Sequence, residues 1–388
     1  MVDMDGQELV DLVRKVFRPM AEDRAMAVLV DLPDREVPDH EEWRQRRELA
    51  LAWTQSLGGR TAELGLDVAL FLYRNVRRAN APLPGMAWRH DCGRGLPLRA
   101  EEMDPAAGST FDAVLRGHRI VLAPTEFSAT APLKTAARQM GFRAATMPGF
   151  TRAMIPALRV DYERVARRCE RLRELLHGAV LARIDFAVDR PSGGTHRLVL
   201  DIRHRVPHAS GGLVPEPGTA GNLPSGETYV APYEGEIAGD PSRSSGTFPV
   251  QHGDEVVVYR VEGNRACEVL TEGPASRAEA SHLSSEPAYG NLSELGLGVL
   301  SDLGVKPVGR VLLDEKLGLH LAFGRSDHLG GSVGPAAFSR PENAEHTDHV
   351  YVPEMQPRIH VGALDLLCGD GRVVALMRDG RYVVEFDG

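Results

Sequence analysis

The stretch AMAVLVDLP at residues 25–33 decides how the first half of the chain folds, because a helix and a second strand of the same kind follow it. It is a compact apolar run that ends at a proline, and DVALFLYR at residues 67–74 repeats the pattern. Between the two runs, EWRQRRELALAWTQSLGG at residues 42–59 is typical of a helix with a glycine stop. Strands that alternate with helices predict a parallel sheet with helices on both of its faces.

The same alternation continues toward residue 178. FDAVLRGHRIVLAP at residues 111–124 predicts the end of a helix and then a strand, and SATAPLKTAARQMGF at residues 128–142 predicts another helix. DYERVARRCERLRELLHGA at residues 161–179 is a strongly charged amphipathic helix. We therefore expect an α/β N-terminal domain over residues 1–178. No GxGxxG motif follows the first strand, so the sequence does not support a dinucleotide site.

From about residue 179 the pattern changes to strands that are joined by Gly, Pro, Asp and Asn turns. VLARIDFAVDR at residues 180–190 and GDEVVVYRVEGN at residues 253–264 are examples. GRVVALMRDGRYVVEFDG at residues 371–388 contains RDG between two strands, which indicates a hairpin. Residues 179–388 are thus expected to form a β-rich α+β C-terminal domain.

Composition excludes several classes of protein. A chain of 388 residues exceeds the usual size of one core, and a formal net charge of -9 argues against a nucleic-acid partner. No apolar run approaches the roughly 20 residues that span a bilayer, and the first residues lack the apolar segment of a signal peptide. The 4 cysteines are far apart and form no CxxC, which indicates neither a zinc ribbon nor a disulfide framework. We expect a cytoplasmic protein.

The stretch EHTDHVYV at residues 345–352 suggests half of a metal site. Its β-branched end favours a strand, in which residues two apart point to the same face. His346 and Asp348 would then direct an imidazole nitrogen and a carboxylate to one point. The alternative is a solvated strand start, where polar residues are common.

Three further polar residues stand in glycine-punctuated apolar segments of the same half. Glu227 lies in NLPSGETYVAP, Glu294 in GNLSELGLGVL and His320 in DEKLGLHLAFG. Taken singly, each glutamate can be a solvated loop residue and the histidine a hydrogen-bonded core residue. Burying an unpaired carboxylate is costly, however, and a shared metal cluster would compensate all of them.

Taken together, NLPSGETYVAP, GNLSELGLGV, LLDEKLGLHLAFG, the glycine pair Gly330–Gly331 and HTD resemble the thermophilic aminopeptidase family in order and approximate spacing. That family includes the enzymes called aminopeptidase T and aminopeptidase S. The resemblance covers the C-terminal half well and the N-terminal half weakly. It implies an α/β domain followed by a β-rich domain with two divalent metals, whose ligands here would be Glu227, Glu294, His320, His346 and Asp348.

The chain departs from the family pattern seven residues after His320. The family has a tyrosine implicated in catalysis there, whereas this chain has Asp327 followed by His328. Either His328 supplies the missing donor, or the chemistry differs, or both residues only cap a loop. Glu315 is a further candidate base with Lys316 as an electrophile, although an exposed salt-bridged pair is the simpler interpretation.

Two functions are therefore expected from the resemblance. The first is a metal-dependent hydrolase with two Zn, Co or Mn ions, which cleaves a peptide or amide bond in a small substrate and forms a homodimer. The second is a mononuclear non-haem Fe(II) dioxygenase that uses His320, His346 and Asp348. It would be similar to 2,5-dihydroxypyridine dioxygenase, in which a histidine replaces the glutamate that corresponds to Glu294.

The glutamate at position 294 favours the hydrolase, whereas the lost tyrosine favours the dioxygenase. A metal-stabilised structural domain is disfavoured, because structural sites are usually closed and rich in thiolates.

Overall fold

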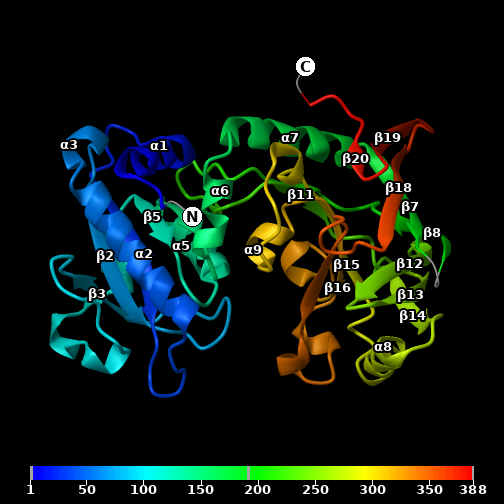
Figure 1. Ribbon diagram of the computed structural model, residues 1–388, viewed down its shortest axis with the longest axis horizontal. Helices are drawn as coiled ribbons and strands as arrows, with labels where there is room; N and C mark the ends of the chain where they lie inside the picture. Colours follow the sequence, from blue (N-terminus) through cyan, green and yellow to red (C-terminus); the bar gives the residue numbers. More distant parts are fainter. Residues whose placement is uncertain (1–2, 190–192, 387–388) are drawn as a thin grey trace. The chain divides into compact units, whose positions relative to one another are not determined.

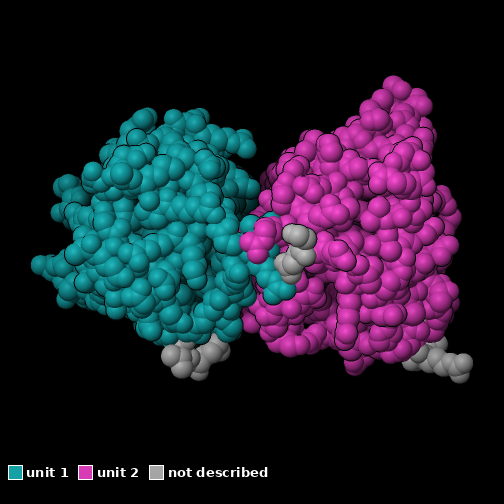
Figure 2. Space-filling view, turned by 90° about the horizontal axis from the view of Figure 1, so that it is seen from above, with its two compact units in different colours: residues 1–166, 212–225 teal, residues 167–211, 226–388 magenta. Residues whose placement is uncertain are grey.

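The computed structural model describes residues 3–189 and 193–386, and the chain divides into two compact units (Figure 2). Unit 1 contains residues 1–166 and 212–225, and unit 2 contains residues 167–211 and 226–388. This division differs from the boundary expected at residue 178. Helix α7 (Tyr162–His177) begins in unit 1 and continues in unit 2, and the later segment 212–225 belongs to unit 1 again.

The sheet of unit 1 has the strand order β10-β6-β5-β1-β2-β3-β4 (Figure 1). Neighbours from β10 to β2 pair in parallel, whereas β3 and β4 are joined antiparallel. The parallel part confirms the α/β prediction for the first half of the chain. The strands are β1 (Ala25–Leu32), β2 (Asp67–Arg74), β3 (Met86–His90), β4 (Ser109–Thr110), β5 (Ile120–Ala123), β6 (Arg143–Thr146) and β10 (Ala220–Asn222).

Long-range pairing explains why unit 1 includes part of the second half of the chain. Strand β10 lies in the range that the sequence assigned to the C-terminal domain, yet it pairs with β6 from Ala220↔Ala144 to Asn222↔Thr146. Local composition does not reveal such a partner. The helices of this unit are α1 (Gly6–Phe17), α2 (Glu41–Gly58), α3 (Thr61–Leu64), α4 (Phe111–Gly117), α5 (Thr130–Met140) and α6 (Ile155–Leu158).

Unit 2 contains a large antiparallel sheet with the order β14-β13-β12-β8-β7-β18-β19-β20. The predicted hairpin is present: Arg378 pairs with Arg381 across Asp379 and Gly380, both of which have positive φ angles. The strands are β7 (Ala179–Val188), β8 (Gly194–Asp201), β12 (Ser245–His252), β13 (Glu255–Glu262), β14 (Arg265–Val269), β18 (Ile359–Cys368), β19 (Val373–Arg378) and β20 (Arg381–Tyr382). Helix α8 (Pro274–Ser285) contacts β13 and β14.

A second antiparallel sheet of unit 2, which we call the site sheet, has the order β17-β16-β15-β11-β9 (Figure 1). One of its faces carries the buried apolar residues Leu295, Leu297, Leu319, Leu321 and Phe323. Its strands are β9 (His208–Ser210), β11 (Glu227–Val230), β15 (Leu292–Gly298), β16 (Leu319–Gly324) and β17 (His346–Val350), and the short helix α9 (Val311–Asp314) precedes β16. In the described parts of the chain, no helix has the length and apolar character that crossing a membrane requires.

Candidate metal centre

The five residues that the resemblance names as ligands all belong to the site sheet and share one of its faces. Glu294 and Asp348 are both paired with Ala322, which places their side chains on the same side of three adjacent strands. His320 is paired with Gly296, two residues after Glu294, and Glu227 is paired with Gly298. Register therefore collects residues that are up to 121 positions apart in the sequence (Glu227 to Asp348).

Alternation along β17 separates the two histidines of HTDH. His346 and Asp348 point to the ligand face, and His346 Nε2 lies 3.4 Å from Asp348 Oδ1. The i, i+2 spacing thus produces the convergence that the sequence predicts. His349 points to the opposite face and packs edge-on against Phe323, with ring centroids 5.5 Å apart. Burial and the charge of His252 lower the pKa of His349 to about 4, so this imidazole is neutral.

Small residues on the ligand face leave room for the larger side chains. A Cβ atom at Gly296 would lie 1.9 Å from Nε2 of His320, so the imidazole occupies the space above this glycine. A Cβ at Gly298 would lie 2.2 Å from the backbone carbonyl carbon of Lys316. Neither position has space for a side chain, so the close approach of His320 and of the Lys316 backbone requires glycine at both.

Gly296→Ala is expected to displace the imidazole of His320 and to weaken metal binding by about 10- to 100-fold, the usual effect of disturbing a ligand's orientation. Overpacking should also cost about 1–3 kcal/mol of unfolding free energy. Calorimetric titration with Zn or Mn measures the affinity. Gly117→Ala is the matched control, since its Cβ meets nothing within 4 Å. Equal affinity in both variants would contradict the placement of His320.

Glu294 lies between two groups of potential ligand atoms. Its Oε1 is 3.3 Å from His320 Nε2, and its Oε2 is 3.1 Å from His346 Nε2. The possible ligand atoms form two groups, and within each group they lie within 4.8 Å of one another. One group consists of Glu227, Glu294 and His320, and the other of Glu294, His346 and Asp348. The two groups share the carboxylate of Glu294.

Two buried oxygens support the fit of these residues to a cation. Glu227 Oε2 and Asp348 Oδ1 are enclosed and have no hydrogen-bond donor among the described residues. A buried carboxylate oxygen normally has a partner. Both side chains are less than a tenth exposed, and both belong to a ligand group, so a divalent cation would satisfy both oxygens.

Backbone carbonyls fix the orientation of both histidines. His320 Nδ1 lies 3.3 Å from the carbonyl oxygen of Gly318, and His346 Nδ1 lies 2.8 Å from that of Arg325. An Nδ1–H that donates to a carbonyl leaves Nε2 as the coordinating atom. In both residues Nε2 is the atom directed at Glu294.

Without a cation, the histidines take up protons. Burial disfavours the charged imidazole, but the nearby carboxylates of Glu294 and Asp348 outweigh it and raise the pKa of His320 to about 9 and that of His346 to about 11. Burial likewise opposes the charged form of Glu294, and the two imidazolium groups hold its pKa well below the usual range.

Lys316 and Glu315 are not the exposed pair that the sequence suggested. The Lys316 side chain is 1% exposed, and its Nζ donates to Glu227 Oε1 at 2.5 Å and also to Glu315 Oε1. Burial opposes the ammonium, but Glu227 and Glu315 raise its pKa above the ordinary range. Burial, together with the charges of Glu227 and Asp348, raises the pKa of Glu315 to about 8 against the effect of Lys316.

Asp327 and His328 occupy a short 3-10 turn, Asp327–Leu329, beside the cluster. The carboxylate of Asp327 accepts from Arg325 Nε at 2.5 Å and from Arg325 Nη2 at 3.2 Å, which supports the loop-capping interpretation. His328 lies edge-on to the ligand His346, with ring centroids 5.0 Å apart. Burial and the charge of His346 lower the pKa of His328, so it is a neutral imidazole at the edge of the cluster.

Glu234 holds this loop in place, a role that the sequence did not suggest. Its Oε2 accepts from the backbone N–H and the hydroxyl of Ser332, both at 2.5 Å, and its Oε1 accepts from Ser326 Oγ and Asn291 Nδ2. Arg205 pairs with it at 3.6 Å and donates to the carbonyl of Gly330 at 3.1 Å. In the sequence, the only sign of this role is that YEGE at residues 233–236 has two acidic residues, Glu234 and Glu236, in a loop.

Comparisons with known proteins show a similarity in fold alone. No family model matches the sequence, and a search of curated proteins finds no match. The chain is similar in structure to 2,5-dihydroxypyridine dioxygenase from Pseudomonas putida KT2440, with a TM-score of 0.59 and 15% identity over 98% of this chain and 99% of that one. It is also similar to AmpT from Thermus thermophilus, with a TM-score of 0.53 and 16% identity over 97% and 99% of the two chains.

The likeness to AmpT is consistent with the resemblance read from the motifs, at the level of the fold. The names of the two structures denote an aminopeptidase and a dioxygenase, so the fold alone does not select between the two expected reactions. The choice has to rest on the ligand face itself.

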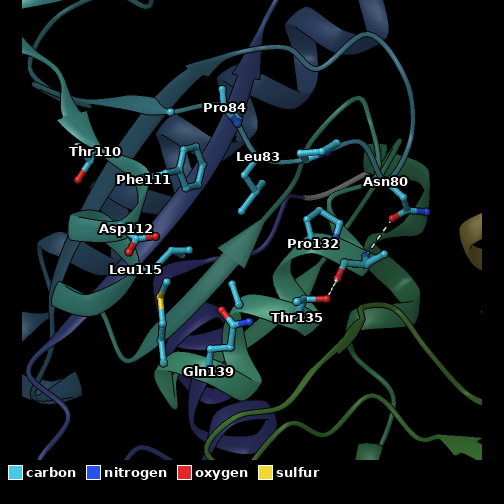
Figure 3. A pocket seen from close by; sticks show the side chains of 15 residues that line it. Asn80, Leu83, Pro84, Thr110, Phe111, Asp112, Leu115, Pro132, Thr135 and Gln139 are labelled. Atoms are coloured by element: carbon cyan, nitrogen blue, oxygen red, sulfur yellow. Dashed lines mark hydrogen bonds between the residues drawn. The ribbon is translucent and has the colours of Figure 1, made fainter.

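A cavity of about 620 Å³ lies in unit 1, and none of the five predicted metal ligands lines it (Figure 3). All of its lining residues belong to unit 1, and Phe111 and Leu115 of α4 and Pro132, Thr135 and Gln139 of α5 are among them. Asp112 is the one ionisable side chain of its lining. The ionisable residues that could hold a metal are therefore on the site sheet and not in this cavity.

Proposed function

We propose that the protein is a metal-dependent hydrolase that cleaves a peptide or amide bond in a small substrate. Two divalent cations, Zn, Co or Mn, would be held by Glu227, Glu294, His320, His346 and Asp348. The observation that carries the proposal is the position of Glu294, whose two oxygens face different ligand groups. A carboxylate with this placement suits a bridge between two cations.

The charge of the ligand face also favours bound cations. Among the described residues, the ligand carboxylates of Glu227, Glu294 and Asp348 outnumber the ammonium of Lys316, which pairs with Glu227. With neutral histidines, divalent cations would offset this excess of negative charge, and they would also stabilise the negative charge that develops on a substrate oxygen.

Cations bound here would polarise a substrate carbonyl and lower the pKa of a water molecule. Glu315 would accept the proton, because burial raises the pKa of this carboxyl and a raised pKa suits a general base. Lys316 would keep Glu227 in its ligating orientation. His328, next to His346, would donate to the substrate at the rim.

A second candidate is the mononuclear Fe(II) dioxygenase with His320, His346 and Asp348 as ligands. It is favoured by the ion pair of Lys316 with Glu227, because the ammonium already offsets the negative charge of this carboxylate and one cation fewer is needed. Among the described residues, however, both groups of ligand atoms within 4.8 Å of one another include Glu294. His320, His346 and Asp348 do not form such a group by themselves. The hydrolase uses Glu294 directly and is therefore our first choice.

Metal binding should release protons and strengthen as pH rises. The pKa values of about 9 for His320 and about 11 for His346 mean that both imidazoles are protonated at pH 7 without metal. A ligating nitrogen must lose its proton, so each displaced proton should strengthen binding by about tenfold per pH unit below these pKa values. Calorimetry in buffers of different ionisation enthalpy counts the protons. Binding that is independent of pH between 6 and 8 would contradict this assignment.

The activity test is a panel of aminoacyl anilides and short peptides, each assayed with Zn, Co and Mn. Release of an amine or amino acid that stops on addition of a chelator and returns with metal supports the hydrolase. A parallel assay with Fe(II), dioxygen and dihydroxylated aromatic compounds tests the second candidate. Oxygen consumption there, with no hydrolysis under any metal, would overturn the proposed function.

A further inference from the structure

Tyr229 lies in the same row of the site sheet as His320. On β11 it is paired with Gly296 of β15, and Gly296 is paired in turn with His320 of β16. Paired residues of antiparallel neighbours point to the same face. The phenol ring of Tyr229 and the imidazole of His320 therefore stand on the ligand face with only a glycine between them.

The ring of Tyr229 is braced from its other side. His208 of β9 is its register partner, and the two rings lie 5.4 Å apart at 33°. The side chain is half-buried between this imidazole and the cluster. A tyrosine held in this way has little freedom to move its hydroxyl away from the ligand face.

The hydroxyl of Tyr229 has no hydrogen-bond partner among the described residues. Other half-buried or buried tyrosines of unit 2 do have one: Tyr233 donates to the carbonyl of Asp240, and Tyr351 to that of Pro249. Because the side chain of Tyr229 is only half-buried, water can satisfy its hydroxyl in the free protein, and a molecule bound beside the ligand atoms can take the place of that water.

The neighbouring groups on this face leave few neutral donors. Glu227 and Glu294 are carboxylates, and the ammonium of Lys316 is already shared between Glu227 and Glu315. A substrate oxygen that approaches the cluster from the β11 side needs a hydrogen-bond donor there. The phenol of Tyr229 is neutral and has an available O–H.

From these contacts we infer that Tyr229 is a catalytic residue whose hydroxyl donates a hydrogen bond to the carbonyl oxygen of a bound substrate. The interaction strengthens as that oxygen gains negative charge, and this accelerates the reaction. The inference rests on the proposed metal-dependent hydrolysis. It adds a residue of β11 that faces the substrate and assigns it no role in holding the cations.

The test uses Tyr229→Phe, which removes only the hydroxyl, and compares it with the parent protein and with Tyr289→Phe. Tyr289 donates to Glu279 of α8, so its variant makes the same chemical change elsewhere in unit 2. Calorimetry measures the binding of Zn or Mn alone and then of leucine hydroxamate to the loaded protein. We expect unchanged metal affinity and about tenfold weaker hydroxamate binding in Tyr229→Phe, the upper range for one lost hydrogen bond. Turnover of an anilide should fall about 10²- to 10³-fold.

The possible failures are distinguishable. A parent protein that binds no metal would overturn the proposed function. A loaded parent that does not bind the hydroxamate would overturn both the inference and the amide substrate. If parent and Tyr229→Phe bind the hydroxamate equally, the inference is wrong and the proposed function stands. A loss of metal affinity in Tyr229→Phe would likewise overturn a role restricted to the substrate.

Discussion

Glu294→Ala is expected to abolish metal binding and hydrolysis together. The variant removes the one carboxylate that both ligand groups share, so His320 and His346 each lose the carboxylate nearest to their Nε2 atom. Loss of an outer-shell contact typically weakens metal affinity by 10- to 100-fold, and loss of this shared ligand should exceed about 100-fold. Metal analysis after dialysis and turnover of an anilide measure the two effects.

Two variants make this experiment specific. Glu227→Ala affects only one ligand group and should lower the metal content in part. Glu262→Ala removes an exposed carboxylate that pairs with Arg260 on β13, and it should leave both quantities unchanged. Circular dichroism checks that each variant is folded. Metal content in Glu294→Ala equal to that of the parent would exclude Glu294 as a ligand.

Lys316→Met is expected to destabilise the metal-free protein by about 3–5 kcal/mol, the usual cost of removing one partner from a buried ion pair. Glu227 and Glu315 would then be two carboxylates close together without their cation. Protonation of these carboxyls relieves the repulsion, so the loss of stability should become smaller as pH falls. Urea unfolding in the presence of a chelator, at several pH values, measures it.

Lys306→Met is the matched control, because Lys306 is 74% exposed and pairs with Glu354 at the surface. Such pairs contribute about 0–1 kcal/mol. If both lysine variants unfold at the same urea concentration, the ammonium of Lys316 does not compensate the two carboxylates.

The local parts of the fold could be predicted from the sequence. DVALFLYR predicts the strand that β2 forms, because a strand covered on both faces is a continuous apolar run. The Asp379–Gly380 turn predicts its hairpin, because both residues tolerate positive φ angles. In each case the deciding interactions lie within a few residues of one another.

What the sequence could not reveal depends on distant partners. Strand β10 belongs to unit 1 through its pairing with β6, which lies more than seventy residues earlier in the chain. The sequence favoured an exposed position for Lys316 in the DEK run, and its buried ion pair with Glu227, 89 positions away, has no local sequence signal. Amphipathic patterns do not encode such contacts.

The candidate site is intermediate between these cases. The i, i+2 spacing of His346 and Asp348 is local and predicts their convergence, whereas the grouping of Glu227, Glu294 and His320 required the motif resemblance. The register of the site sheet explains that grouping afterwards. Asp327 was singled out as a departure from the family, and its pairing with Arg325, two residues earlier, supports a structural role.

The most direct test of the central claim is metal analysis of the protein purified without added metal, followed by reloading and dialysis. Two divalent ions of Zn, Co or Mn per chain, with both lost in Glu294→Ala, is the result that we predict. One equivalent of iron per chain, retained when Glu294 is replaced, would contradict the account, because the ligands would then be those of the dioxygenase alternative.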